Sequence, residues 1–516
     1  MSQKVDVVVI GAGHQGLVAA TELAAKGLSV VVVERGDQAG GAIRSGELTQ
    51  PGHIHDYWAT NMGLFLGSPF FATYGAELAN LGLSFAHSTT PYASAFPDGK
   101  NLYVDQNAEA TMAMWQSHNA KDAQGWGELG ALFGDFAGAY FPIYGNPLPS
   151  KGTWQGARSL WKTRGKKGSG ELMRILLSST RALGERYFES REARSLLAAW
   201  GMHLDYAPDI TGGAVFPLLE CFIDMANGMS IVQGGASNLP KAMVSLLEKK
   251  GGTLRLNADV EQIITGDKGA EGVRLVGGET IYAKRGVIST VVLPVMAKRL
   301  LTESALPKNM NQAASHYRFG PGTMMVHYAI NSTNISWSDA RLGKYAYVHI
   351  GPYVDDMART YQQSLAGELP TEPLLVIGQS STVDPTRAPE GKGTVWVQVR
   401  TLPNSPKGST WAEQAERYAD QVTAKIERYA PGYSASVLGR HVMSPADLEA
   451  ANPNLVGGDS VAGSHHFDQF LLRPSLDLGR YESEIPRLYL AGAGTWPGAG
   501  VNAISGGLAA KRLLKR

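Results

Sequence analysis

Residues 5–45, VDVVVIGAGHQGLVAATELAAKGLSVVVVERGDQAGGAIRS, decide the fold of this chain. The apolar, β-branched run at residues 7–10 is too short for a helix and predicts a buried parallel strand. A glycine-rich turn follows at residues 11–16 and leads into a helical pattern. Residues 29–33 predict a second strand, and Glu34 stands at its end. This order of strand, glycine turn, helix, strand and acid predicts a dinucleotide-binding unit.

Each residue of the turn has a physical role in such a unit. Gly11 permits the tight turn, Gly13 lets the backbone approach a pyrophosphate, and Gly16 lets the helix pack closely on the strand. The helix N-terminus presents free N–H groups and a partial positive charge to the phosphates. Glu34 is placed to accept hydrogen bonds from ribose hydroxyls, and its charge would repel a 2′-phosphate.

The residues after Glu34 indicate which dinucleotide binds. Arg35, Gly41, Arg44 and Ser45 belong to a second glycine turn with cations and a hydroxyl, which suits a ligand that continues past the pyrophosphate. This stretch resembles the FAD-binding half of the flavin amine oxidase and phytoene desaturase superfamily. The resemblance implies that the cofactor is FAD.

The resemblance continues through the middle of the chain. Residues 238–249 predict a helix between two glycine pairs, and residues 253–289 predict alternating strands. In the superfamily, the valine that matches Val260 lays its backbone against the adenine. Residues 384–389 and 444–449 resemble motifs of the phytoene desaturase-like subgroup that includes proteins like pyridine nucleotide-disulphide oxidoreductase domain-containing protein 2.

The expected fold class is α/β, with an FAD-binding Rossmann-like domain of the glutathione-reductase type that is discontinuous in sequence. A second α+β domain would hold the substrate or cap the site. We expect the FAD-binding domain at residues 1–70, 229–300 and 475–516, and the second domain at residues 71–228 and 301–474. A chain of 516 residues exceeds what one hydrophobic core usually organises, which agrees with two domains.

The carboxyl-terminal block, LYLAGAGTWPGAGVN at residues 488–502, predicts a strand and a glycine turn before a helix over residues 501–514. A helix N-terminus at this place would stabilise negative charge on the reduced flavin ring. By resemblance, the residues of this block that contact FAD are Gly492, Gly494, Val501 and Asn502.

Trp496 stands where phytoene desaturases usually have a histidine. An indole cannot transfer protons as an imidazole does, which puts a carotenoid substrate in doubt. We expect Trp496 to wall the substrate cavity over the flavin ring.

The composition excludes several classes of function. The 47 basic and 46 acidic residues give no global field to attract nucleic acid. Cys221 is the only cysteine, so an intramolecular disulfide and a CxxC redox pair are excluded. His53, His55 and Asp56 lack further ligands at metal-binding spacing, so we expect no metal site. The N-terminus predicts a strand rather than a signal peptide, and no run of about eighteen apolar residues predicts a spanning helix, so we expect a cytoplasmic protein.

Candidate catalytic bases are few. The sequence has no GxSxG motif and no catalytic cysteine context, so the difficult chemistry would belong to the flavin. Side chains that could take a proton are His55, Asp56, His465 and His466, each of which is also an ordinary structural residue. The catalytic residues therefore stay undetermined from the sequence.

Residues 150–170 predict a basic loop that carries Trp154 and Trp161, followed by a helix over residues 170–188. The loop is the best candidate for peripheral contact with an anionic membrane, and a solvated flexible loop is the alternative. Its basic residues are Lys151, Arg158, Lys162, Arg164, Lys166 and Lys167.

Three functions agree with these patterns. The first is an FAD-dependent dehydrogenase or desaturase acting on a hydrophobic or amphipathic small molecule. The second is a flavin amine oxidase acting on a C–N bond, and the third is a flavin-binding protein without turnover. Substrate, electron acceptor and oligomeric state are not determined by the sequence.

Overall fold

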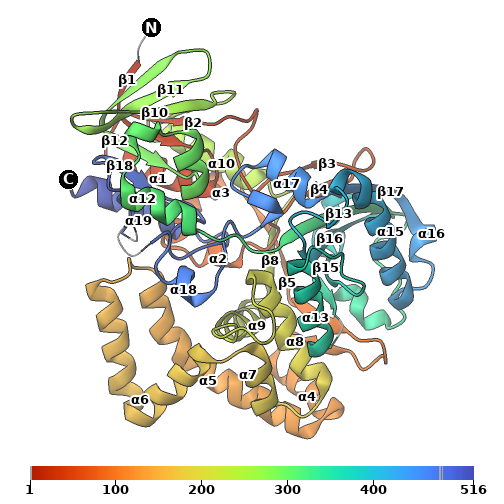
Figure 1. Cartoon of the computed structure of the whole chain (residues 1–516). Coiled ribbons are helices and arrows are strands. Elements are labelled where there is room, and N and C mark those ends of the chain that lie inside the picture. The colour runs from red at the N-terminus through yellow and green to blue at the C-terminus, as the bar shows by residue number, and fades with distance from the viewer. Residues whose placement is uncertain (1–2, 352, 476–477, 479) are drawn as a thin grey trace.

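The computed structural model describes residues 3–351, 353–475, 478 and 480–516 (Figure 1). A seven-stranded sheet runs in the order β10-β11-β12-β1-β2-β9, and β18 pairs with β12. Its members are β1 (Gln3–Ile10), β2 (Val30–Val33), β9 (Thr253–Arg255), β10 (Val260–Gly266), β11 (Gly269–Leu275), β12 (Thr280–Ser289) and β18 (Leu488–Leu490). Strands β9, β2, β1, β12 and β18 are parallel, whereas β10 and β11 add an antiparallel meander. Separate stretches of the chain therefore share one sheet.

Both faces of this sheet are covered, because alternate residues of β1 point to opposite sides. Val7 and Val9 are buried beneath helices on one side, and Val8 and Ile10 pack on the other. The helices of the first side are α1 (His14–Ala24), α3 (Pro69–Asn80), α10 (Asn238–Lys249) and α19 (Ile504–Leu514), and those of the second are α11 (Leu293–Arg299) and α12 (Lys308–His316). The predicted α/β, Rossmann-like fold class is confirmed, while the boundaries of the predicted domains stay a prediction.

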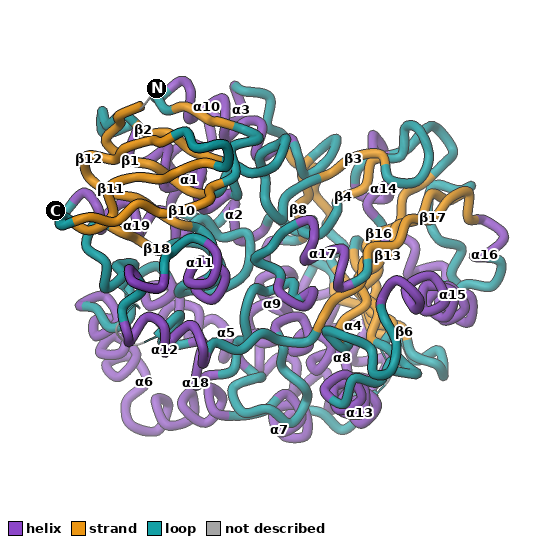
Figure 2. The backbone as a smooth tube through the Cα atoms, turned by 45° about the horizontal axis from the view of Figure 1, so that its top comes forward, coloured by secondary structure: helices purple, strands orange, loops and turns teal. Residues whose placement is uncertain are grey.

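A second seven-stranded sheet lies apart from the first (Figure 2). Its order is β17-β13-β16-β15-β14-β6-β7, antiparallel except for the pair β14 and β6. Its strands are β6 (Tyr92–Ala95), β7 (Leu102–Val104), β13 (Gly322–Ile330), β14 (Tyr347–Ile350), β15 (Leu374–Gly378), β16 (Gly393–Leu402) and β17 (Val437–Met443). The amphipathic helix α15 (Trp411–Tyr429) packs on it through residues such as Tyr418 and Ile426.

A group of helices adjoins the second sheet (Figure 1). Its members are α4 (Ala108–His118), α5 (Ala120–Tyr144), α6 (Lys151–Leu177), α7 (Thr180–Tyr187), α8 (Arg191–Gly201) and α9 (Val215–Asn227). Trp126 joins them by stacking between Trp115, with ring centroids 4.3 Å apart, and Phe222, at 4.5 Å. Shorter elements used below are β3 (Ser45–Glu47), β4 (Ile54–Asp56), β8 (Met229–Val232), α13 (Val354–Leu365), α17 (Pro445–Ala451) and α18 (Phe467–Phe470).

The region predicted as a loop over residues 150–170 is helical, so that prediction is wrong. α6 covers it, with Gly165 in a non-helical conformation (φ 62°, ψ −168°). Ser150 caps the helix by accepting a hydrogen bond from the Thr153 amide at 3.2 Å. The lysines and arginines of this stretch and Leu160 favour a helix, and their propensity outweighs that of the scattered glycines. The side chain of Arg164 lies outside the described part of the chain.

The helix predicted over residues 170–188 is interrupted by Ser178 and Ser179. Ser178 is extended, and Ser179 caps α7 by accepting a hydrogen bond from the Ala182 amide at 3.2 Å. Serine competes for backbone hydrogen bonds and so favours a cap over a helix interior.

The last helix begins later than residue 501. Ala503 is left-handed, with φ of 56°, and α19 starts at Ile504. Asn502 accepts a hydrogen bond from the Ile504 amide at 3.0 Å through its Oδ1. Val501 and Asn502 therefore precede the helix, and the prediction that they form its first turn is corrected.

Candidate active site

The glycine turn after β1 is shaped by close approach of backbone. Gly11 has φ of 97°, and a Cβ at this residue would lie 2.3 Å from Thr290 Oγ1. A Cβ on Gly16 would lie 2.0 Å from the Gly11 carbonyl oxygen, so only glycine lets α1 pack on the turn. Gly13 differs, because its φ is −66° and a Cβ there would meet no atom closer than Gly41 Cα at 3.9 Å. The space in front of Gly13 is therefore open to a ligand.

Glu34 is oriented by the turn itself. Its Oε2 accepts a hydrogen bond from the Ala12 amide at 2.8 Å, and its Oε1 accepts one from the Gly36 amide at 2.9 Å. Each carboxylate oxygen retains a lone pair that can accept from a ligand hydroxyl. The carboxylate is thus held at the end of β2 beside the glycine turn.

A cavity of about 440 Å³ runs along this turn and continues to the carboxyl-terminal glycines. The predicted cofactor residues that line it are Gly11, Gly13, Gly16, Glu34, Arg35, Gly41, Arg44, Gly492 and Val501. Val260 lines an adjoining cavity of about 100 Å³, which shares Gly11 and Glu34 with the first.

Gly494 and Asn502 were also predicted to contact the cofactor, but they line neither cavity. A Cβ on Gly494 would lie 3.1 Å from Val292 Cγ1, so this glycine serves backbone packing. Asn502 instead joins the two ends of the chain, because its Oδ1 accepts a hydrogen bond from Gln15 Nε2 at 2.9 Å. The Gly506 amide donates to Gln15 Oε1 at 2.8 Å and completes this link.

A segment that the sequence did not single out for the cofactor also covers the large cavity. Residues 450–455 lie along it, although they were predicted to belong to the substrate domain. Asn454 fixes them by accepting from the Val292 amide at 3.0 Å and donating to the Thr290 carbonyl oxygen at 3.2 Å. The signal in the sequence for this segment was the motif at residues 444–449, which directly precedes it.

A third cavity, of about 200 Å³, opens from the large one and is walled by aromatic rings. Tyr347 and Trp396 stack with centroids 5.7 Å apart and planes 3° from parallel. The other aromatic lining residues are Trp58, Trp200 and Phe216. The residues that line both cavities are Ala42, Ala59, Ser460, Ala499, Gly500 and Val501.

Ionisable groups interrupt this aromatic lining. Glu220 and Asp224 lie one turn apart on α9 and both line the small cavity. Burial raises the pKa of Glu220 to about 7. The pKa of Asp224 is raised by burial and, in addition, by the neighbouring charge of Glu220. Sequence reasoning missed this pair, although two acids in the apolar helix LLECFID were a usable signal.

His203 and Arg400 also line the small cavity. Burial lowers the pKa of His203 below its usual range, and the nearby positive charge of Arg400 lowers it further. His203 Nε2 lies 3.1 Å from Nε2 of His349, so one imidazole donates and the other accepts. The sequence analysis did not identify these residues, because their spacing along the chain carries no pattern.

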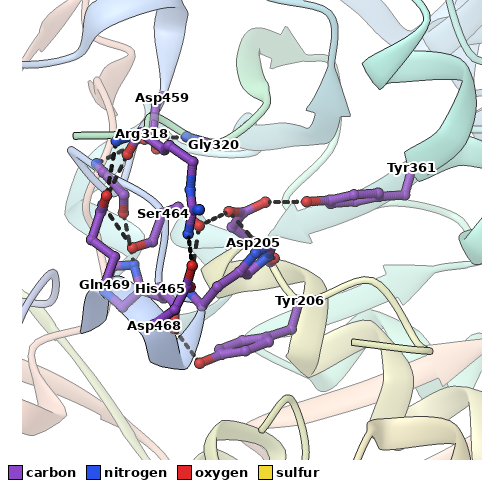
Figure 3. A network of polar contacts seen from close by, with 12 residues as sticks. Asp205, Tyr206, Arg318, Gly320, Tyr361, Asp459, Ser464, His465, Asp468 and Gln469 are labelled. Atoms are coloured by element: carbon purple, nitrogen blue, oxygen red, sulfur yellow. Dashed lines mark hydrogen bonds and ion pairs between the residues drawn. The ribbon is translucent and has the colours of Figure 1, made fainter. Parts of the chain in front are cut away.

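A buried polar network holds residues 460–462 against the cavities (Figure 3). Asp459 accepts hydrogen bonds from the amides of Gly320 and Gly463, each at 2.8 Å. Asp205 accepts from the Tyr361 hydroxyl at 2.8 Å and from the Ser464 hydroxyl at 2.7 Å. The network ties this loop to β13, α13 and the end of α8.

His465 and His466 belong to this network rather than to a cavity. His466 Nε2 lies 2.8 Å from the Asp205 carbonyl oxygen, and His465 Nδ1 lies 3.0 Å from that of Gly463. Neither histidine lines the cavities described above. This placement does not support a role for them as catalytic bases. Hydrogen bonds to backbone carbonyl oxygens explain why the two histidines lie here.

His55 and Asp56 are placed similarly. Asp56 forms a fully buried ion pair with Arg387, with Oδ1 2.8 Å from Nη1, and also accepts from the Ala236 amide at 2.8 Å. Arg387 in turn pairs with Asp384 at 3.0 Å, which explains the motif at residues 384–389. His55 is buried 2.8 Å from Thr49 Oγ1. Neither candidate base lines the cavities, because both serve packing between β4 and its neighbours.

Trp496 does not wall the small cavity. Its ring packs against Phe470, with centroids 5.2 Å apart, and against Tyr144 of α5, at 6.3 Å. Trp496 lines neither the large nor the small cavity, whose aromatic wall includes Tyr347 and Trp396, and its place over the ring of the cofactor stays a prediction.

A model of the flavin containing amine oxidoreductases matches residues 16–514. The chain belongs to this family. Its curated relatives include pyridine nucleotide-disulfide oxidoreductase domain-containing protein 2 of Rattus norvegicus, which is 27% identical over 97% of this chain and 92% of the relative. Phytoene desaturase (neurosporene-forming) of Rhodobacter capsulatus is 26% identical over 97% of this chain and 91% of its own. A putrescine oxidase triple mutant has the same fold, with a TM-score of 0.64 and 15% identity over 100% of this chain and 99% of its own.

The protein is thus an FAD-dependent oxidoreductase, and its cavities fit that cofactor. Gly13 leaves room for a phosphate at the N-terminus of α1, where unpaired backbone N–H groups favour an anion. His14 lines the large cavity, and its buried Nε2 has no hydrogen-bond partner among the described residues. An orphaned buried polar atom is costly, and a polar ligand relieves it.

Gly13→Ala and Gly11→Ala should separate cofactor binding from folding in this flavoprotein. Gly13→Ala should leave the unfolding free energy of the FAD-free protein unchanged, while it weakens FAD binding by about 1–3 kcal/mol through the added methyl group. Gly11→Ala should instead lower the stability of the FAD-free protein, because of its positive φ and the contact with Thr290. Urea unfolding and FAD titration measure the two effects. Equal FAD affinity for Gly13→Ala and wild type would contradict this placement of the phosphates.

The raised pKa of Glu220 should make stability depend on pH. Its pKa rises from 4.5 to about 7 on folding. The stability that its protonated form gives is present below pH 4.5 and is lost as the pH rises through 7. Relative to Glu220→Gln, the wild type should lose about 3 kcal/mol of unfolding free energy across this window. The exposed Glu303→Gln is the control, and parallel pH profiles of all three proteins would refute the raised pKa.

Proposed function

We propose that FAD lies along the large cavity and that the flavoprotein oxidises a small amphipathic molecule in the 200 Å³ cavity. The observation that carries this proposal is the shared wall at Gly500 and Val501, where the aromatic cavity meets the cavity of the glycine turn. A substrate in the small cavity would therefore lie beside the end of the cofactor that is remote from its phosphates.

In this proposal the chain binds FAD by its backbone. The N-terminus of α1 and Gly13 hold the pyrophosphate, Glu34 holds a ribose, and Val260 lies at the adenine. Gly500 and Val501 bring backbone close to the flavin ring. When bound, FAD supplies the oxidising equivalents for breaking a C–H or N–H bond of the substrate.

The size of the small cavity supports a compact substrate. A dry cavity of about 150 Å³ admits benzene, so about 200 Å³ suits a molecule with one ring or a short chain. The relatives named phytoene desaturase support dehydrogenation of an apolar or amphipathic compound as the reaction class. The stacked Tyr347 and Trp396 would orient the flat or apolar part of that compound.

The protein also offers a group that can hold the proton released in the reaction. Glu220 lines the small cavity, and its pKa of about 7 lets the carboxylate take up and release a proton near neutral pH. We therefore propose the Glu220 carboxylate, in place of His55, Asp56, His465 or His466, as the acceptor of the proton.

Anaerobic mixing with a substrate panel tests this function. Small single-ring or short-chain amphipathic compounds should bleach the visible flavin band, whereas phytoene should not, because it exceeds the cavity. Glu220→Gln should slow the bleaching by about 100-fold or more if it removes the proton acceptor. A flavin that no compound reduces would contradict the proposal and favour a flavin-binding protein without turnover.

Oxidation of an amine is a second candidate, and the carboxyl pair favours it. Once one of its groups is ionised, the Glu220–Asp224 pair can receive an ammonium group in the small cavity. In the same panel, bleaching by primary amines and release of an aldehyde would identify this reaction, whereas a desaturated product would identify the first.

We also propose that α5 and α6 touch an anionic membrane surface. Apolar side chains are exposed on these helices, notably Trp154 at 73% and Trp161 at 56%, beside exposed basic residues such as Lys162. No helix in the described part of the chain is long and apolar enough to span a bilayer. Basic and aromatic residues on one helix suit a surface contact instead.

Co-sedimentation with anionic phospholipid vesicles tests the membrane contact. The double variant Trp154→Ser, Trp161→Ser should bind vesicles more weakly, by about 1–2 kcal/mol for each indole removed from the interface. Val276→Ser is the control, because Val276 is 66% exposed but follows β11 of the first sheet and does not belong to α5 or α6. This variant should bind as the wild type does. Equal sedimentation of the double variant and the wild type would refute the contact.

A further inference from the structure

The small cavity contains a guanidinium without an anionic partner. Arg400 lies on β16, between β13 and β15, and lines this cavity but not the larger one. Its Nη1 donates to Ser460 Oγ at 3.0 Å, and its buried Nε has no partner. Among the residues that the structure describes, no carboxylate oxygen lies within 4.0 Å of its nitrogens. Among these residues, Nε and Nη2 therefore make no hydrogen bond, although Nε itself is covered by its neighbours.

Two other arginines show how this protein compensates a buried guanidinium. Arg387 is fully buried and is paired with Asp56 and Asp384. Arg473 is also fully buried, and although its Nε has no partner among the described residues, its Nη1 and Nη2 donate to the carbonyl oxygens of Ala493 and Gly463. Arg400, in contrast, has the Ser460 hydroxyl as its hydrogen-bond partner among the described residues, and burial lowers the pKa of Arg400 to about 10. A guanidinium that is shielded from water and has no anionic partner is energetically costly unless a ligand pairs with it.

We propose that Arg400 anchors a carboxylate group of the substrate, an inference that rests on the proposed use of the small cavity as the substrate site. The Nε–Nη2 edge of a guanidinium matches the two oxygens of a carboxylate in a planar, bidentate geometry. Because Arg400 lines the small cavity and not the large one, a ligand that pairs with it would lie on the substrate side rather than the pyrophosphate side.

The surroundings define the ligand further. Tyr347 and Trp396 supply a flat aromatic wall in the same cavity as Arg400, and the volume of about 200 Å³ limits the ligand to roughly one ring. Glu220 and Asp224 line the same cavity and would repel a dianion such as a phosphate more than a carboxylate. The ligand class is therefore a small monocarboxylate with an apolar or aromatic body.

Titration calorimetry on the FAD-loaded protein tests the anchor with benzoate and benzamide as probes. The two compounds share size and shape, but only benzoate carries a charge. Wild-type protein should bind benzoate about 10- to 100-fold more tightly than benzamide, as expected for charge-assisted hydrogen bonds in a closed site. Benzoate cannot be dehydrogenated at a saturated carbon, so its binding is read independently of turnover.

Variants assign the preference to the guanidinium. Arg400→Met should abolish the preference for benzoate and should not lower the melting temperature, since it removes a partly buried charge that has no ion-pair partner among the described residues. Arg400→Lys keeps the charge but not the fork, so it should bind benzoate about tenfold more weakly than wild type. Arg440→Met is the matched control, because Arg440 lies in the same sheet but is paired with Glu416 and Asp420.

The outcomes separate this inference from the proposed function. Preference for benzoate that is lost in Arg400→Met and kept in Arg440→Met supports the anchor, even if no compound reduces the flavin. Equal affinity for the two probes in the wild type overturns it, as does preference retained in Arg400→Met. If Arg400→Met does not fold, the wild-type ratio and Arg400→Lys decide the question.

Discussion

The structure depends on one buried amide that joins the two ends of the chain. Gln15, in the first turn of α1, donates to Asn502 and accepts from the Gly506 amide. A Cβ on Gly506 would lie 2.1 Å from the Gln15 carbonyl oxygen, so α19 can approach α1 this closely only through glycine. This contact places the carboxyl-terminal glycines beside the amino-terminal turn, and the large cavity exists because the two glycine-rich segments meet there.

Buried polar groups in this protein divide into those that hold the fold and those that face a cavity. The Asp56–Arg387–Asp384 cluster is closed, with each charge matched by an opposite charge within hydrogen-bond distance. The groups along the small cavity are open, because in the described part of the chain neither Glu220 nor Asp224 forms an ion pair with a cation, and Arg400 forms none with a carboxylate. Native interiors tolerate such incomplete pairing where a ligand completes it, which is why these groups carry the functional proposals.

Sequence patterns predicted elements well where one local signal was sufficient. The helix α10 begins and ends at the predicted residues, because it has an apolar face and clear boundaries. Residues 150–170 were predicted to form a basic loop, but helix-favouring lysines and arginines are part of α6 there. The histidines and the aspartate chosen as candidate bases resembled catalytic clusters by proximity in sequence, whereas their side chains are used in buried hydrogen bonds.

The sequence by itself determined the dinucleotide-binding turn, the parallel strands around it and, through resemblance, FAD as the cofactor. These follow from residues adjacent in the chain, whose spacing fixes φ, helix packing and backbone approach. Only the tertiary structure decided which ionisable groups face the small cavity, since α9, β16 and residues 203 and 460 meet there from distant parts of the chain. Burial and pairing depend on such distant neighbours, and therefore Glu220 and Arg400 could be recognised only once the chain was folded.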